Sequence, residues 1–425
     1  MRKTAWMMLI IIAVSWVLAG CSGRGETDGN GNRAETEAAG VQTLTVLTNR
    51  IDLIENGTME RYAKPFELEH PGTKIEFQGL GNYTADIMTR LSTLNMGDVL
   101  LLPANMLAQD LPQYFEPIPD KLFDSVRFAD YKSVNGVRYG IASGASTIGI
   151  VYNKKAFEKA GISEAPTTLS SFYEVCEKLK EAGITPVFLN YGAQWPMKTW
   201  GEELVSFMTG DPDYLNKMAE TDKPWDLDNQ WGHSIKIVQT LIHKGYTEQG
   251  LMTNQWESSK KKLASGDAAM FLNGNWVINQ IIEAGADPDE IGFFPFPYDD
   301  SEKRYAPMLP DWFVGVSKFS SNKQLAESWV KYFVTQSGYV EEQGYLPVKI
   351  NSDTAMSPQL EQFMSFSPSF VESVPPSDKF LQIAEKANIS LWSGDYIQEW
   401  IASSDLQKTF EQYNARWQEA RQLEQ

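Results

Sequence analysis

The chain has few of the residues that carry nucleophilic, redox and metal chemistry. It holds only two cysteines, Cys21 and Cys176, and three histidines, His70, His233 and His243, among 425 residues. No Cys/His cluster has the spacing of metal ligands. There is no G-x-S-x-G nucleophile elbow and no G-x-x-x-x-G-K phosphate loop. We therefore expect no metal and no other cofactor, and nucleophilic catalysis finds little support.

Basic charge and long apolar runs are also scarce. Lys and Arg number 37 against 55 Asp and Glu, which gives a formal net charge of −18. Such a surface repels nucleic acid and anionic lipid, so we expect no nucleic-acid partner. After residues 6–18, no segment approaches the about 20 apolar residues that a membrane-spanning helix needs.

The N-terminus has the pattern of a secretory signal peptide. Arg2 and Lys3 precede the apolar run 6–18, and small residues follow it. The string LAGC at 18–21 resembles a bacterial lipoprotein processing site, in which the cysteine is lipidated and becomes the new N-terminus. We expect residues 1–20 to be removed and Cys21 to carry the lipid. The alternative is an ordinary signal peptide with an incidental cysteine.

The segment after Cys21 fits a flexible tether. Residues 22–40 contain no aromatic residue and too few apolar ones to fold. As a coil, 21–40 would span about 25 Å and hold a folded body outside the membrane. We therefore predict a lipid-anchored protein on the extracellular or periplasmic side of the cell membrane. Cys176, on the apolar face of a predicted helix, is expected to be a small buried side chain.

The remaining chain alternates strand and helix patterns, which predicts an α/β fold. In the first part, short apolar strands are expected at 44–47, 74–77 and 99–102, with helices over 59–66 and 83–94. The long β-prone segment 139–154 follows. Beyond it we expect strands at 185–190, 268–272, 291–297, 313–316 and 346–350, and helices over 169–182, 234–243, 257–264, 275–284 and between 323 and 342, with a helical C-terminal region.

Several strings in order resemble the extracellular solute-binding proteins of bacterial carbohydrate ABC importers, the group that includes maltose-binding protein. They are YNK at 152–154 with Phe157 and Gly161, GDAAMF at 266–271 leading into GNW at 274–276, and SNK at 321–323. Each string is short, and their order and spacing carry the likeness, which extends over nearly all of the mature chain.

The resemblance implies a bilobed periplasmic-binding-protein-like fold (type II). Two α/β lobes would be joined by about three crossing segments near Ile150, Val316 and Val348, with the ligand in the cleft between them. The first lobe would comprise 41–150 plus 317–347 and the second 151–316 plus 348–425. The implied protein is a monomer that captures a sugar or oligosaccharide and delivers it to ABC transporter permease subunits.

The ends of the predicted strands nominate the residues that would line this cleft. Ligands of open α/β sheets bind beyond the carboxyl ends of the strands. Trp276, which follows the strand 268–272, is the position where the resemblance is strongest. The candidate ligand-binding residues are Asn49, Arg50, Asp52, Tyr83, Asn105, Ser143, Asn190, Trp195, Asn273, Trp276, Asp311 and Trp312.

The candidates suit a neutral polyol. Aromatic rings cover the apolar faces of a sugar, carboxylates accept hydrogen bonds from its hydroxyls, Arg donates and Asn does both. These candidates also have a purely structural interpretation. The three tryptophans, and a fourth at Trp392, would then be core residues. Asp52 and Asp311 would cap helices or lie on the surface.

Two other classes of function stay open at this point. A secreted glycoside hydrolase would also have a Trp-rich cleft and paired carboxylates. A binding protein for a peptide or a polyamine would share the fold. The order of the motifs favours a sugar-binding protein without enzymatic activity.

Overall fold

The computed structural model describes residues 41–81, 83–104, 106–301, 303–350 and 356–424. The predicted signal peptide, Cys21 with its linker, and the candidate Asn105 lie outside these residues. Residues Val41–Gln425 form one compact unit. Across the described ranges, no helix combines the length and the hydropathy that crossing a membrane requires.

The first sheet is built mainly from the N-terminal part of the chain. Its strand order is β2-β1-β3-β13-β6, with β1 parallel to β2 and β3, and β13 antiparallel to β3 and β6. The predicted strands 44–47, 74–77, 99–102 and 313–316 are confirmed. The bounds are β1 Gln42–Thr48, β2 Thr73–Gly79, β3 Val99–Leu101, β6 Ile141–Ala142 and β13 Phe313–Val316.

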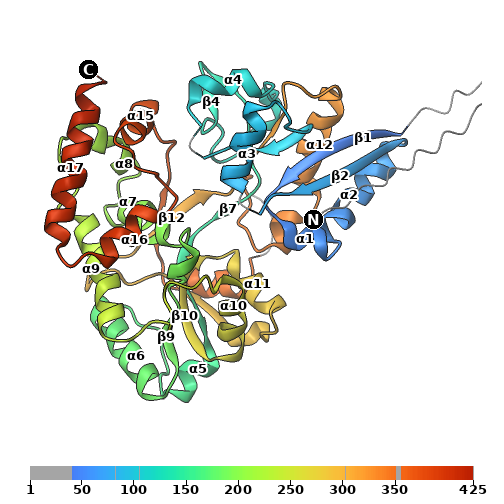
Figure 1. Cartoon of the computed structure of the whole chain (residues 1–425). Coiled ribbons are helices and arrows are strands. Elements are labelled where there is room, and N and C mark those ends of the chain that lie inside the picture. Colours follow the sequence, from blue (N-terminus) through green and yellow to red (C-terminus); the bar gives the residue numbers. More distant parts are fainter. Residues whose placement is uncertain (1–40, 82, 105, 302, 351–355, 425) are drawn as a thin grey trace, which may run out of the picture. The chain divides into compact units, whose positions relative to one another are not determined.

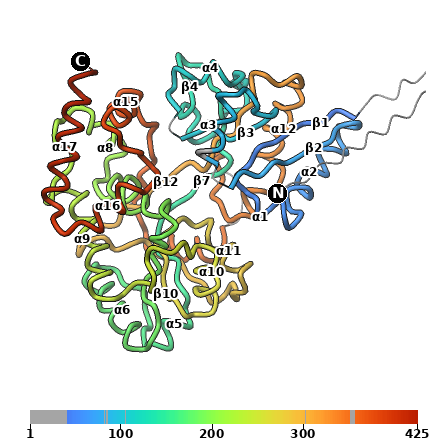
Figure 2. Tube along the Cα trace, in the orientation of Figure 1, coloured from blue at the N-terminus to red at the C-terminus, as the bar shows by residue number. Residues whose placement is uncertain are grey.

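Helices from the N-terminal part of the chain and from residues 323–342 cover the first sheet (Figure 1). The ring of Trp329 in α12 packs edge-on against Phe66 in α2 at 5.2 Å, and the Tyr332 hydroxyl donates to the Tyr62 carbonyl at 2.9 Å. Figure 2 shows α12 beside the N-terminal strands. The helices are α1 Ile51–Glu55, α2 Thr58–Glu69, α3 Tyr83–Ser92, α4 Leu111–Tyr114, α12 Lys323–Gln336 and α13 Tyr339–Glu342, with short 3-10 turns η1 Ala108–Asp110 and η2 Asp120–Leu122.

A short β-hairpin with a two-residue turn lies beside the first sheet. It joins β4 (Ser133–Val134) to β5 (Val137–Arg138) through Asn135 and Gly136, whose φ angles are 51° and 77°. Asn-Gly suits such a turn because both central residues need positive φ. The hairpin fixes the direction of the residues immediately before it, which line the site described below.

The second sheet has the order β11-β8-β10-β9. Strand β8 is antiparallel to β10 and β11, and β9 is parallel to β10, so the sheet is mixed. All residues of β8 and β10 are buried, since helices cover both faces. The bounds are β8 Ile148–Asn153, β9 Thr185–Val187, β10 Ala268–Gly274, β11 Ile291–Phe294, and the helices nearby are α5 Lys154–Lys159, α6 Leu169–Glu181, α10 Trp256–Ser265, α11 Val277–Glu283, α14 Pro358–Ser365 and η6 Pro288–Glu290.

A third, three-stranded sheet has the order β14-β12-β7 and connects the other two along the chain. Strand β7 (Ala145–Ser146) lies between β6 and β8 in sequence, and β12 (Tyr305–Pro310) precedes β13. Strand β14 is Ser369–Glu372. Neither β12 nor β14 was expected from the sequence. Because β13 pairs with β3, residues 313–316 extend the first sheet.

Helices at the C-terminus pack with those of the middle of the chain around buried tryptophans. Trp225 lies 5.6 Å from Trp400 and 5.3 Å from Trp417, in edge-on contacts. Many of the 13 tryptophans are thus core residues. The elements are η4 Thr199–Glu203, α7 Leu204–Met208, α8 Tyr214–Lys217, η5 Met218–Glu220, α9 Gln230–His243, α15 Asp378–Lys386, α16 Asp395–Ala402 and α17 Leu406–Gln422, and η3 Tyr191–Ala193 precedes them.

The hydrophobic interior divides between the two larger sheets. One cluster surrounds the first sheet with α2, α3 and α12, and others surround the second sheet and the C-terminal helices. Cys176 is fully buried in the second group, as predicted, and burial raises the pKa of its thiol. Separate cores under separate sheets are what a two-lobed α/β fold requires.

Candidate functional site

A cavity of about 240 Å³ lies where residues of the two larger sheets and the connecting strands meet. Side chains from all three regions form its walls. Those from the first sheet and its hairpin are Leu102, Ala104, Tyr131, Lys132 and Phe313; those from the connecting strands are Ser146, Leu309, Pro310, Asp311 and Trp312; the others are Ile148, Trp195, Lys198, Thr199, Glu203, Asn273, Gly274, Trp276, Pro376 and Trp392.

Five of the predicted residues line this cavity together: Trp195, Asn273, Trp276, Asp311 and Trp312. They come from a span of more than a hundred residues, after β9, in β10, before α11 and between β12 and β13. The strand-end rule therefore brought real neighbours together. Trp392, the fourth tryptophan considered from the sequence, lines the same cavity.

An aromatic wall of Trp195 and Trp276 lies on the side of the second sheet; both residues line the cavity, and Trp256, which does not line it, packs against them. The ring centroids of Trp195 and Trp276 are 6.0 Å apart, and Trp256 contacts both, at 4.9 and 6.0 Å. All three side chains are half-buried. Trp256 was missed because it starts a helix and does not follow a strand. A half-exposed aromatic wall presents area on which an apolar ligand face can stack.

Trp312 contributes a further aromatic side chain. Its ring meets that of Tyr83 at 5.2 Å with an interplanar angle of 64°. Tyr83 was predicted to contact ligand, but it is buried and does not line the cavity. Its hydroxyl donates to the Leu101 carbonyl at 3.1 Å and accepts from the Leu101 amide at 2.7 Å. Tyr83 thus supports Trp312 from behind.

Asp311 supplies a carboxylate to the cavity, and Ser143 fixes its orientation. The Ser143 hydroxyl lies 2.7 Å from Oδ2 of Asp311, and the Asp311 amide donates to the Gly144 carbonyl at 2.8 Å. Burial raises the pKa of Asp311, and the Ser143 hydrogen bond opposes that shift. Ser143 itself is buried outside the cavity lining, so its contact is with Asp311.

The predicted residues after β1 do not line the cavity. Arg50 is 8% exposed, and its guanidinium donates to Asp52 at 2.6 Å and to Oε1 of Gln343 at 2.7 Å. Burial works to lower the pKa of Arg50, but its hydrogen bond to Asp52 and its charge interactions with Tyr339, Tyr345 and Asp52 together raise the pKa. Asn49 is also absent from the cavity wall. The donors of Arg50 are therefore used within the protein.

Asn190 lies apart from the cavity as well. It is buried in a left-handed conformation with φ of 56°. Its Oδ1 has no hydrogen-bond partner among the described residues. The carboxylate of Glu248 accepts from the amides of Leu189 at 2.7 Å and Tyr191 at 3.3 Å, and so holds this turn. The turn after β9 is rigid, and it is Trp195, farther along, that reaches the cavity.

Polar wall residues that the sequence argument missed include Lys132, Ser146, Lys198, Thr199 and Glu203. Nζ of Lys198 lies 2.9 Å from the Glu203 carboxylate, which also accepts from the Thr199 hydroxyl at 2.9 Å. Thr199 and Glu203 lie on the π-helical turn η4, which Lys198 directly precedes and which is distorted at Gly201. Such turns are frequent at functional sites, but a strand-end rule cannot find them.

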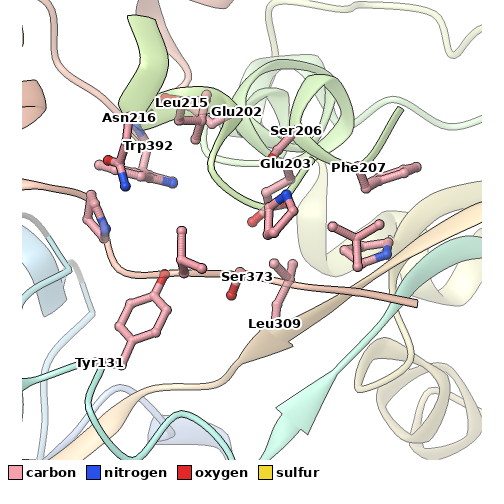
Figure 3. A pocket seen from close by; sticks show the side chains of 15 residues that line it. Tyr131, Glu202, Glu203, Ser206, Phe207, Leu215, Asn216, Leu309, Ser373 and Trp392 are labelled. Atoms are coloured by element: carbon pink, nitrogen blue, oxygen red, sulfur yellow. Dashed lines mark hydrogen bonds between the residues drawn. The ribbon is translucent and has the colours of Figure 1, made fainter. Parts of the chain in front are cut away.

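A smaller cavity of about 70 Å³ adjoins the first and shares Tyr131, Glu203, Leu309, Pro376 and Trp392 with it. Figure 3 shows Tyr131 on one side and the helical turn with Glu202 and Glu203 on the other. Burial raises the pKa of Glu202 to about 7, while Oε1 accepts from the Trp392 amide at 2.6 Å. Glu202 therefore helps to fix Trp392.

Comparison with known proteins decides the family. Residues 52–339 match the family model of the bacterial extracellular solute-binding proteins. The chain belongs to this family. It is accordingly a binding protein and not an enzyme, and the glycoside hydrolase alternative is set aside. The resemblance inferred from the short strings is confirmed.

Solved structures of other solute-binding proteins share the fold. A binding protein of an ABC transporter from Bifidobacterium animalis subsp. lactis, in complex with mannobiose, has 27% identity and a TM-score of 0.81 over 90% of this chain and 95% of that one. A manno-oligosaccharide specific solute-binding protein from the same organism, with mannotriose, has 25% identity and a TM-score of 0.82 over 92% and 96%. The predicted periplasmic-binding-protein-like α/β fold is confirmed.

A relative by sequence is an uncharacterized ABC transporter extracellular-binding protein of Pyrococcus horikoshii. It is 23% identical over 413 residues, which are 89% of this chain and 86% of the relative. A maltotriose-binding protein of Pyrococcus abyssi is 25% identical over 248 residues, 57% of this chain and 49% of that protein.

Proposed function

We propose that the solute bound by this protein is an oligosaccharide. The observation that carries this proposal is the cavity in which the tryptophans Trp195, Trp276 and Trp312 line the same space as the carboxylate of Asp311 and the amide of Asn273. Aromatic faces cover the C–H faces of a sugar ring, while carboxylate and amide groups bond its hydroxyls in fixed geometry. The mannobiose- and mannotriose-bound structures with the same fold support the proposal.

The charge balance of the cavity favours a neutral ligand. Lys198 forms an ion pair with Glu203, so these two charges compensate each other. Asp311 and Lys132 add one carboxylate and one amine to the wall. A polyamine would call for an excess of carboxylates, and a peptide would call for partners for both of its termini. A neutral polyol needs neither.

The cavity wall also suggests how binding is linked to closure. The cavity is lined by residues of both larger sheets. A ligand that contacts both sides would therefore favour the arrangement in which the two sides lie closer together. In this proposal the lobes keep the bounds expected from the sequence, 41–150 plus 317–347 and 151–316 plus 348–425, except that residues 313–316 (β13) pair with β3 in the first sheet. A permease of an ABC importer would then receive the ligand from the closed form.

We further propose that the mature protein is held at the cell membrane by a lipid on Cys21, facing the extracellular side or the periplasm. The support is the string LAGC at 18–21 and the polar segment that follows it. A diacylated cysteine meets the requirement of more than one anchor chain.

Thermal unfolding of the purified full chain with mannobiose, mannotriose, raffinose and maltotriose, each added separately, tests the oligosaccharide proposal. A sugar present at 100 times its dissociation constant should stabilise the protein by about 2.7 kcal/mol. Spermidine and a tripeptide serve as comparison ligands. Stabilisation by either of these, with none by any sugar, would refute an oligosaccharide ligand.

A further inference from the structure

Lys132 is a buried lysine in the wall of the cavity. It is 5% exposed, and its Nζ donates to the carbonyls of Pro103 at 3.0 Å and Ala104 at 3.2 Å. It forms no ion pair with another described residue. Asp378 is the carboxylate that acts on it through its charge, without a direct contact. Among the described residues, its amine is therefore held by two backbone oxygens alone.

The fold positions this amine firmly. The Asn135-Gly136 hairpin follows directly, and the Tyr139 amide donates to the carbonyl of Lys132 at 2.9 Å. The preceding ring, Tyr131, stacks on Phe313 with centroids 5.1 Å apart and an interplanar angle of 22°. The Lys132 side chain thus reaches the loop after β3, at the carboxyl edge of the first sheet, where ligands of α/β proteins bind.

A buried ammonium without a carboxylate partner is costly to maintain. Desolvation of a charge is unfavourable unless pairing and hydrogen bonds offset it. Burial accordingly lowers the pKa of Lys132 to about 8, so that the amine is still largely protonated at neutral pH. The hydrogen bonds from Nζ of Lys132 to the two carbonyls need only two N–H donors, which a neutral amine also has, so these bonds alone do not require the positive charge. A perturbed titratable group in a cleft marks a candidate for function.

The chemistry of the amine leaves one donor for a ligand. A lysine ammonium has three N–H donors and no acceptor, and two of the three are used by Pro103 and Ala104. We propose that Lys132 donates its third N–H to a hydroxyl oxygen of the bound sugar. This inference rests on the proposed oligosaccharide function. It gives the first-sheet wall a charged donor, complementary to the Asp311 carboxylate, which accepts.

The test compares Lys132→Met with Lys121→Met. Methionine has a similar length and no donor, and Lys121 is an exposed lysine on η2, so the control makes the same chemical change away from the cavity. Calorimetric titration with mannobiose and mannotriose should show at least a tenfold rise in Kd for Lys132→Met, as expected for a lost charge-assisted bond, and no change for Lys121→Met.

Unfolding in urea, without sugar, is measured on the same proteins. If the amine serves only to hold the loop, Lys132→Met should lower stability and leave the Kd of the folded protein unchanged, and that outcome would overturn the inference. If the unmutated protein binds none of the sugars, the proposed function has failed instead, so the two failures are distinguishable.

A pH series provides a second measurement that does not depend on the mutant's stability. Sugar affinity of the unmutated protein should fall as pH rises from 7 to 10, because the amine loses its proton above its pKa of about 8. The other titratable groups near it are Asp378, Tyr131, Lys198, Glu203 and Asp311. Lys132→Met keeps all of these, so the difference between the two pH profiles isolates Lys132. Identical profiles would contradict the inference.

Discussion

Gly274 and Trp276 are sterically dependent on each other. A β-carbon on Gly274 would lie 2.6 Å from Cδ1 of the Trp276 ring, well inside contact distance. The backbone at 274 is not in the left-handed region, so the absence of a side chain there serves the position of the ring. The last residue of β10 thereby restricts where the Trp276 ring of the aromatic wall can lie.

Gly274→Ala should therefore displace the Trp276 ring and weaken sugar binding by about tenfold or more. The free energy of unfolding should fall by about 1–3 kcal/mol, as is typical when a side chain is added to a packed site. Gly81→Ala is the matched control, because its new β-carbon would meet only ordinary contact, 3.8 Å from Cδ1 of Ile51. Calorimetric titration measures the effect. Equal affinities for both variants would show that ring placement does not matter to the ligand.

Trp276→Ala should weaken sugar binding by about 2 kcal/mol, roughly thirtyfold in Kd, which is typical of an aromatic hot spot. Its side chain is half-buried, so the loss of stability should be limited. Trp400, fully buried in the C-terminal core, gives the contrast: Trp400→Ala should cost about 3–5 kcal/mol of stability. Titration and denaturant unfolding separate the two roles. Unchanged affinity with a large loss of stability would make Trp276 a core residue.

Glu202 should make the protein's stability depend on pH. Its pKa in the folded protein is about 7, raised by burial above the ordinary value of 4.5. Between these values the folded state binds the proton and the unfolded state does not. The contribution of Glu202 to the free energy of unfolding is therefore fully present below pH 4.5. It is lost as the pH rises through 7, and the loss is on the order of 3 kcal/mol.

Glu202→Gln is the variant that checks this. The glutamine oxygen can still accept from the Trp392 amide, as Oε1 of Glu202 does at 2.6 Å. Urea unfolding should find the variant about as stable as the unmutated protein at pH 4.5 and more stable at pH 8. Glu257→Gln, at an exposed carboxylate, is the control that should show no such gain. A variant less stable at pH 8 would contradict the prediction.

Cys21→Ala should abolish lipid attachment. The altered protein should then appear in the medium or periplasm, or persist with its signal peptide uncleaved, because the string LAGC at 18–21 would lose the cysteine that carries the lipid. Cell fractionation and mass spectrometry of the N-terminus measure this. An unmodified mature N-terminus at a residue other than 21 in the unmutated protein would disprove the anchor.

The sequence by itself determined the local elements and the family. Apolar periodicity is a property of neighbouring residues, so strands such as 44–47 and helices such as 169–182 could be predicted from it. The strand-end rule likewise placed Trp195, Asn273 and Trp276 in one cavity, because the edge of a sheet collects residues from distant parts of the chain.

Only the tertiary structure decided which polar groups face the cavity. Arg50 matched the strand-end rule, but its donors are used by Asp52 and by Gln343, 293 residues away in the chain. Lys132 follows no strand, and it reaches the cavity because a hairpin and a stacked ring direct it there. Whether a tryptophan such as Trp276 or Trp400 lines a cleft or fills a core depends on which distant side chains pack around it, and a local sequence pattern does not contain that information.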